Sequence, residues 1–409
     1  MLWTLDTVSR LLFWCGLSLL LAGVSKVLIP LSFWLTFSGA FLVLGNLHLL
    51  LASFEITTTG KAVLVTGCDS GFGYALALRL DALGFHVFAG CLQASGESAR
   101  DLASSASSRL RVIQLDITKE EEVNAALKEV KDLLSPGGKG FHVFAGCLQA
   151  SGESARDLAS SASSRLRVIQ LDITKEEEVN AALKEVKDLL SPGEELWGLV
   201  NNAGISTFGA VEWTSLPVFR EVADVNLFGH IRVTKAFLPL IRKSKGRLVN
   251  VTSAEGRFTA PFVAAYELTK HAMEAFSDCL RHEMQRFGVH VCVVEPGNYT
   301  AGTKLNTAER AKRLAASLWS AMTDEVRHAY GKNNFDRVVS SMESVTNTGL
   351  VDLTSAVDAM TKALTQRYPQ ARYTCMDSRL YIRGLVAQHM PEWIYDFLYV
   401  NEVRNVWYN

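Results

Sequence analysis

The segment KAVLVTGCDSGFGYALALRL, residues 61–80, decides the fold. Ala62 to Thr66 form a short apolar run with β-branched residues, which predicts a buried parallel strand. A glycine-rich turn follows, and a helical pattern begins at Tyr74. Glycine lets the backbone approach a pyrophosphate, and the N-terminus of a helix stabilises its charge. The turn residues that this pattern assigns to the cofactor site are Gly67, Asp69, Ser70, Gly71 and Gly73.

Three further strand ends carry small or polar residues. The run LWGLV ends in Asn-Asn-Ala-Gly, whose Asn202, Ala203 and Gly204 suit close approach of a cofactor. The run LVNVT ends at Ser253, and VCVVE ends at Pro296 and Gly297. Apolar strands that alternate with helical segments predict an α/β, doubly wound, Rossmann-like parallel sheet.

Tyr266 and Lys270 are four residues apart, so a helix places both on one face. A tyrosine is a poor base at neutral pH, and a neighbouring cation lowers its pKa. We therefore expect Tyr266 to transfer the proton, Ser253 to bond the substrate oxygen, and Asn226 to hold a water that leads to Lys270. A Tyr-x-x-x-Lys pair alone is common on solvated helices. Here the pair follows the glycine turn, the Asn-Asn-Ala-Gly segment, Asn226 and Ser253 along the chain, and this order favours a catalytic role.

These motifs resemble the short-chain dehydrogenase/reductase family from Lys61 to about Arg404. Within the family the chain is similar to the subgroup of D-beta-hydroxybutyrate dehydrogenase, 17-beta-hydroxysteroid dehydrogenase type 2 and retinol dehydrogenases, through stretches such as WGLVNNAGISTFG and EAFSDCLRHEM. The resemblance implies a hydride transfer between a nicotinamide cofactor and a secondary alcohol or ketone. It also implies that Tyr266 and Lys270 contact the cofactor.

The cofactor is expected to be NAD, with NADP as the alternative. The end of the second strand, at Gly90-Cys91 or Gly146-Cys147, carries no acid for the ribose and no Arg or Lys for a 2′-phosphate. Asp69 would repel such a phosphate. Asp116 or Asp172, in equivalent places of a repeat, resembles the acid that contacts adenine.

An identical repeat interrupts the domain, because residues 84–137 recur unchanged as residues 140–193. Solenoid repeats diverge and come in larger numbers, so this pair indicates a recent duplication or an error in the assembled sequence. Each copy predicts strand, helix, strand, helix, and a doubly wound sheet needs one such unit. We expect one copy to complete the sheet and the other to be extruded or loosely packed.

Residues 1–55 predict a membrane anchor, and residues 56–409 the dehydrogenase domain. Charges are absent from 11 to 25 and from 27 to 54, with Lys26 between, which favours a helical hairpin or one spanning helix after a cleaved or interfacial segment. The aromatic tail 390–400 suits a membrane interface, a dimer contact or a substrate lid. The endoplasmic reticulum is the favoured location, and the mitochondrial inner membrane the alternative.

Composition excludes several other classes of protein. A formal charge of −1 gives no basic face for nucleic acid, and the seven cysteines show no zinc-binding or disulfide pattern, so no metal is expected. The partners expected are a small-molecule alcohol or ketone and membrane lipid, and a second copy of the chain is a further candidate.

Three functions compete. A 3-hydroxybutyrate dehydrogenase needs a cation for the carboxylate, and Arg257 is the nearest in sequence to Ser253. A steroid or retinoid dehydrogenase needs a long apolar pocket, for which the candidates are Phe258, Phe262, Tyr299, Trp319 and Met322. The third is a non-catalytic membrane-bound binding protein, disabled by the duplication.

Overall fold

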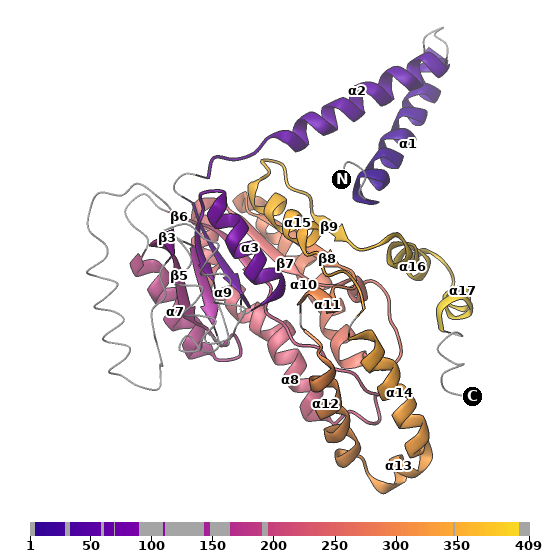
Figure 1. Cartoon of the computed structure of the whole chain (residues 1–409). Coiled ribbons are helices and arrows are strands. Elements are labelled where there is room, and N and C mark those ends of the chain that lie inside the picture. Colours follow the sequence, from indigo (N-terminus) through magenta and orange to yellow (C-terminus); the bar gives the residue numbers. More distant parts are fainter. Residues whose placement is uncertain are drawn as a thin grey trace.

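The computed structural model describes residues 5–28, 33–58, 61–68, 70–89, 109–110, 143–147, 164–189, 195–303, 305–346 and 348–400. A parallel sheet forms the centre of the molecule (Figure 1). Its strands are β1 (Lys61–Thr66), β2 (His86–Ala89), β3 (Arg109–Leu110), β4 (Val143–Cys147), β5 (Ser164–Gln170), β6 (Glu195–Asn201), β7 (Arg247–Val251), β8 (His290–Pro296) and β9 (Arg372–Cys375).

Helices cover the sheet on both faces. On one face lie α3 (Gly71–Ala82) and α15 (Thr354–Thr365), and on the other lie α7 (Glu176–Leu189), α9 (His230–Ser244) and α10 (Ala264–Met284). The helix α8 (Leu216–Ala223) precedes a π-helical turn at Asp224–Gly229, which leads directly into α9. Short 3₁₀ turns lie at Ala254–Gly256 and Gln285–Phe287.

The strand order is β3-β5-β4-β2-β1-β6-β7-β8-β9, and all pairings are parallel except a single antiparallel contact between β2 and β4. This confirms the predicted Rossmann-like fold, with β1 in the centre. Because the chain crosses over between β1 and β6, loops on the two sides of that point diverge and leave a crevice at the carboxyl ends of the strands.

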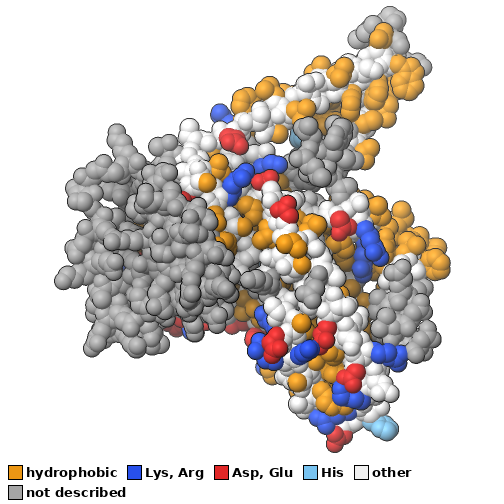
Figure 2. Space-filling view, viewed as in Figure 1, with side chains coloured by type: hydrophobic (Ala, Val, Ile, Leu, Met, Phe, Trp, Pro, Cys, Tyr) orange, Lys and Arg blue, Asp and Glu red, His pale blue; other side chains and the backbone are white. Residues whose placement is uncertain are grey.

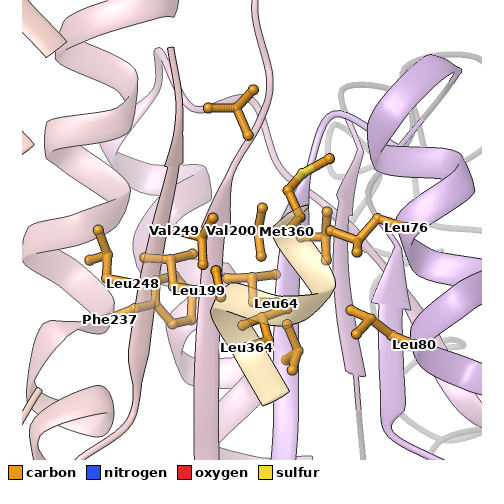
Figure 3. Close-up of a cluster of buried hydrophobic side chains, with 14 of the residues drawn as sticks. Leu64, Leu76, Leu80, Leu199, Val200, Phe237, Leu248, Val249, Met360 and Leu364 are labelled. Atoms are coloured by element: carbon orange, nitrogen blue, oxygen red, sulfur yellow. The ribbon is translucent and has the colours of Figure 1, made fainter. Parts of the chain in front are cut away.

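The centre of the sheet is apolar on both faces, as its sequence runs require. Leu64 of β1, Leu199 of β6 and Val249 of β7 are fully buried. Figure 3 shows them between Leu76 of α3, Met360 of α15 and Phe237 of α9. Strands buried on both faces explain why the sequence shows apolar runs there rather than alternation.

The repeat joins the sheet through strands of both copies. The second copy supplies β4, β5 and α7, close to the boundaries that the sequence predicts. The first copy supplies β2 and β3. The edge of β1 is shared, because Ala62 and Val63 pair with β2, whereas Leu64 to Thr66 pair with β4. Most other residues of the first copy, and the predicted first helix of the second, lie outside the described residues.

Two N-terminal helices form a hairpin beside the domain (Figure 1). They are α1 (Leu5–Leu28) and α2 (Phe33–Ser53), and only α2 is long and apolar enough, among the described helices, to cross a membrane. Its side chains face outward, with Leu35 71% exposed, and Figure 2 shows apolar side chains along this hairpin. The backbone after α2 is fixed to the domain by a hydrogen bond from Ile56 N to Thr365 O (2.8 Å).

The C-terminal third adds two helical layers. The first contains α11 (Thr300–Thr303), α12 (Ala308–Ala321), α13 (Asp324–Tyr330) and α14 (Lys332–Val345). The second contains α16 (Ser378–His389), α17 (Glu392–Tyr395) and a π-helical turn at Asp396–Val400. Both layers contribute residues to the walls of the crevice above the sheet.

Candidate active site

The glycine-rich turn is packed against the Asn-Asn-Ala-Gly segment. Asn202 Nδ2 donates hydrogen bonds to the carbonyl oxygens of Thr66 (3.0 Å) and Gly67 (2.9 Å). A Cβ atom at Gly73 would lie 2.3 Å from Gly67 O, and one at Gly67 would lie 2.6 Å from Ala203 Cα. Only glycine fits these positions, and Gly67 also has a positive φ of 71°.

A cavity of about 850 Å³ opens at the carboxyl ends of the strands. Its walls bring together nearly all of the residues that the sequence assigns to the cofactor, namely Gly67, Ser70, Gly71, Asp172, Asn202, Ala203, Gly204, Pro296 and Gly297. Gly73 lies behind the turn, in contact with Gly67 and Asn202. Asp69 and Asp116 lie outside the described residues.

The cavity fits a dinucleotide. The turn before α3 leaves a glycine cradle at a helix N-terminus, where Ser70 makes no side-chain cap. Asp172 follows β5 and is fixed, because its Oδ1 accepts hydrogen bonds from Thr174 N (3.0 Å) and Thr174 Oγ1 (2.6 Å). Of Asp116 and Asp172, the two acids predicted to contact adenine, Asp172 lies at the cavity.

Ser253, Tyr266 and Lys270 meet in the same cavity. Ser253 follows β7, whereas Tyr266 and Lys270 lie one turn apart on α10. The Ser253 side chain is close enough to the Tyr266 hydroxyl to lower the pKa of that hydroxyl. Lys270 Nζ donates to Val251 O (3.1 Å) and lies 5.5 Å from the centre of the Tyr266 ring.

Asn226 lies in the π-helical turn and is fully buried. Its Oδ1 accepts from Ile205 N (2.8 Å), and its Nδ2 donates to Ile205 O (2.9 Å) and to Thr269 Oγ1 (3.2 Å). The amide thus fixes the backbone after Gly204 to the helix that carries Lys270. Because both amide hydrogens are used, the predicted water on Asn226 is not held by its N–H groups.

The environment opposes charge on both catalytic groups. Burial raises the pKa of Tyr266 above its usual value, and the Glu255 carboxylate raises it further, while the hydrogen bond with Ser253 lowers it. Burial lowers the pKa of Lys270 to about 8. A phenolate at Tyr266 therefore depends on nearby positive charge.

The family model for short chain dehydrogenases matches residues 61–139, which include the first copy of the repeat, and residues 136–314, which include the second copy. The chain belongs to the short-chain dehydrogenase family.

Several relatives share most of this dehydrogenase chain. Rattus norvegicus mitochondrial D-beta-hydroxybutyrate dehydrogenase is 43% identical over 84% of both chains. Mus musculus retinol dehydrogenase 7 is 35% identical over 84% of this chain and 89% of its own. Bos taurus 17-beta-hydroxysteroid dehydrogenase type 6 is 33% identical over 83% and 87%.

A solved structure agrees on the fold of the dehydrogenase. A short-chain dehydrogenase from Streptomyces avermitilis gives a TM-score of 0.51 at 21% identity, over 84% of this chain and 98% of that one. At this identity the likeness concerns the fold alone.

Arg257, predicted to bind the substrate, is not among the residues that line the cavity of this dehydrogenase. Its Nε lies 3.3 Å from Glu295 Oε1 in an ion pair. The structure therefore does not bring Arg257 together with Ser253 and Tyr266.

The sequence did not predict five charged residues that line the cavity, namely Glu221, Asp224, Glu255, Arg310 and Arg383. Glu255 lies two positions after Ser253, and this spacing could have pointed to it. Arg383 comes from α16, more than 100 residues beyond Lys270, and no local pattern indicates it. Of the predicted apolar candidates, Phe258 and Tyr299 line the cavity. Phe262, Trp319 and Met322 belong instead to a separate hydrophobic cluster around Trp213.

Proposed function

We propose that this protein is an NAD-dependent dehydrogenase that interconverts D-3-hydroxybutyrate and acetoacetate. The proposal is supported by 43% identity to a D-beta-hydroxybutyrate dehydrogenase and by the Arg383 side chain on the wall of the cavity. The choice of NAD is supported by Gly146-Cys147 at the end of β4, where no Arg or Lys stands for a 2′-phosphate. Asp172 supports it further, since it adds negative charge on that side.

The chemistry follows from the residues above the sheet. The bound nicotinamide cofactor supplies the hydride acceptor and, when oxidised, a positive charge near Tyr266. Tyr266 takes the proton of the substrate hydroxyl, and Lys270 stabilises the phenolate because its ammonium group lies beside the ring. Ser253 bonds the same substrate oxygen and limits its possible positions.

The observation that carries the substrate proposal is the position of Arg383. Its guanidinium lies 4.6 Å from the centre of the Phe258 ring, and its Nε donates to Tyr395 Oη (2.9 Å). It also donates through Nη2 to Thr259 O (3.4 Å), which leaves Nη1 without a hydrogen-bond partner among the described residues. A fixed guanidinium on the wall of the cavity suits the carboxylate of a small hydroxy acid.

A steroid or retinoid is the second candidate, because much of the wall is apolar. Phe208, Val263, Leu314, Met342 and Leu380 line the cavity beside the catalytic residues. Relatives at 33% and 35% identity are named for steroid and retinol oxidation. A cavity of this kind would bind an extended apolar alcohol.

We also propose that α2 anchors the enzyme in a membrane, with the endoplasmic reticulum favoured and the mitochondrial inner membrane as the alternative. The proposal is supported by the apolar, outward-facing surface of α2. Trp393 and Phe397 lie near the C-terminus and are each 69% exposed, which supports an additional contact with the membrane–water interface. Contact with a second copy of the chain is the competing use of this surface.

The test is a substrate comparison on the full-length protein in detergent or lipid. NAD reduction is followed with D-3-hydroxybutyrate, with 17-beta-estradiol and with all-trans-retinol, and each is repeated with NADP. Turnover of hydroxybutyrate with NAD supports the proposal. Turnover of estradiol or retinol alone moves the assignment to the second candidate. No turnover and no NAD binding would mean that the duplicated segment has disabled the enzyme.

A further inference from the structure

Phe262 adopts a backbone conformation that its own side chain disfavours. Its φ is 71°, and among the described residues other than glycine only Lys245 also has a positive φ. In this left-handed region Cβ lies too close to the following carbonyl oxygen, so bulky residues rarely occupy it. Phe262 comes directly before Val263, the N-cap of the catalytic helix α10. Its surroundings must therefore hold it in this conformation.

Two contacts restrain Phe262. Gly209 N donates a hydrogen bond to Phe262 O (2.7 Å). The Phe262 ring stacks on the Trp213 ring, with 5.5 Å between the ring centres and 24° between the ring planes. Both aromatic residues are buried. The carbonyl group and the side chain of Phe262 are thus fixed independently, and together they fix the turn.

Trp213 is itself held by the helical layer of α12, α13 and α14. Its ring centre lies 5.3 Å from that of Tyr330 on α13 and 5.1 Å from that of Phe335 on α14. Leu318 of α12 belongs to the same buried cluster. Helices that follow β8 in the chain therefore restrain the residue that precedes α10.

The left-handed turn directs two neighbouring side chains to different places. Phe262 lies in the hydrophobic cluster, whereas Val263 lines the cavity. Val263 O then accepts hydrogen bonds from Tyr266 N and Glu267 N (3.0 Å each), which close the first turn of α10. A change of φ at Phe262 would move this first turn, and Tyr266 with it, relative to Ser253.

We propose that Phe262 is a positioning residue for Tyr266, because its ring, packed against Trp213, keeps the left-handed turn at the start of α10. The inference rests on the proposed function for the role of Tyr266 in proton transfer. Phe262 does not line the cavity, so it acts through the first helical turn. The layer of α12 to α14, which forms a wall of the cavity through Leu314 and Met342, thereby also sets the position of the proton-transferring hydroxyl.

A comparison of Phe262→Ala with Phe262→Gly separates positioning from packing. Both changes remove the ring, and glycine leaves the larger space. Alanine keeps the Cβ atom that disfavours a positive φ, whereas glycine adopts this conformation without strain. A role in packing alone predicts that Phe262→Gly is at least as damaging as Phe262→Ala. The positioning role predicts that Phe262→Gly is the more active of the two.

The first measurement uses no substrate and consists of crystal structures of both full-length variants in detergent. In Phe262→Gly the left-handed turn should remain, with the Tyr266 ring centre close to its distance of 5.5 Å from Lys270 Nζ. In Phe262→Ala the φ of residue 262 should become negative, and Tyr266 should move away from Ser253. An unchanged turn or an unmoved Tyr266 in Phe262→Ala overturns the proposal.

The second measurement is kinetic. We expect kcat of Phe262→Ala to be about tenfold or more below that of Phe262→Gly, because a small displacement of a reacting group strongly slows the reaction. The dissociation constant for NAD should be nearly the same in both variants, because neither change touches the glycine turn. Equal kcat values, or a lower kcat in Phe262→Gly, contradict the positioning role. Absence of turnover in the wild type would count against the proposed function, and the structural comparison would then decide the inference.

Discussion

The ammonium nitrogen of Lys270 lies over the ring of Tyr266, 5.5 Å from its centre. The two side chains share one face of α10, one helical turn apart. Helix geometry thus sets the distance between the proton-transferring group and the charge that stabilises its phenolate.

Tyr266→Phe should abolish most of the activity, because the ring remains but the proton acceptor is removed. We expect kcat to fall by about 10²- to 10⁴-fold, with little change in NAD binding. Stopped-flow or steady-state NAD reduction measures the loss. Tyr330→Phe, in the hydrophobic cluster outside the cavity, is the matched control and should keep wild-type activity. Comparable turnover in Tyr266→Phe would exclude Tyr266 as the proton-transferring residue.

Arg383→Ala should raise the KM for D-3-hydroxybutyrate by about 10- to 100-fold, because a charge-assisted hydrogen bond to the carboxylate is lost. The same change should leave the KM for an uncharged secondary alcohol nearly unaltered. Arg257→Ala, which breaks the pair with Glu295, should affect stability more than KM. If Arg257→Ala raises the KM and Arg383→Ala does not, the carboxylate binds at the position predicted from sequence.

Gly73→Ala should weaken NAD(H) binding more than tenfold. The added methyl would lie 2.3 Å from Gly67 O, so the turn must move. Isothermal titration or quenching of tryptophan fluorescence reports the dissociation constant. Gly39→Ala in α2 is the control, since a methyl there has no neighbour within 4 Å. Wild-type affinity in Gly73→Ala would show that the turn does not bind the cofactor.

Glu267 should make the fold less stable as the pH rises. It is 3% exposed, and burial raises its pKa to about 8 from an ordinary value of 4.5. The folded state therefore binds a proton that the unfolded state releases, and stability falls between about pH 4.5 and pH 8, by up to ~1.4 kcal/mol per pH unit. Glu267→Gln should flatten this dependence in urea unfolding at pH 5 and pH 8. A slope equal to that of the wild type would contradict the assignment.

Deletion of residues 84–139 should leave a functional enzyme. The two copies are identical, so deletion of residues 138–193 would yield the same shortened sequence. The strands β4 and β5, the helix α7 and the cofactor-side Asp172 all come from the second copy. We expect the shortened chain to bind NAD within about threefold of the full chain and to unfold at a similar or higher temperature. Loss of binding would show that the first copy is needed for the sheet.

The sequence predicted those parts of the site that follow strands. Gly67, Asn202, Ser253 and Pro296 each stand at the end of a buried strand, and parallel strands bring such ends to one edge. The helical pair Tyr266 and Lys270 followed from a fixed spacing. These predictions depend on local periodicity and spacing, which the sequence contains directly.

The substrate side followed no such rule. Arg257 is the basic residue nearest in sequence to Ser253, but its guanidinium pairs with the buried Glu295. Arg383 reaches the cavity because α16 folds back over the 3₁₀ turn after Ser253, and it is held there by Phe258 and Tyr395. The residues on this wall of the cavity are determined by the packing of helices that are distant in sequence. No motif spacing predicts them.

Two identical segments of this chain compete for pairing with the same edge of β1. Its first residues pair with His86 and Val87, and its last with Phe144 to Gly146, from two segments of the same sequence. A slip of one whole repeat period would present the same side chains to β1, so side-chain recognition cannot tell the two registers apart. Which copy pairs with β1 then depends on the unequal lengths of chain on either side of each copy. During synthesis the first copy leaves the ribosome before its duplicate, so β2 is available to pair with β1 before β4 has been made.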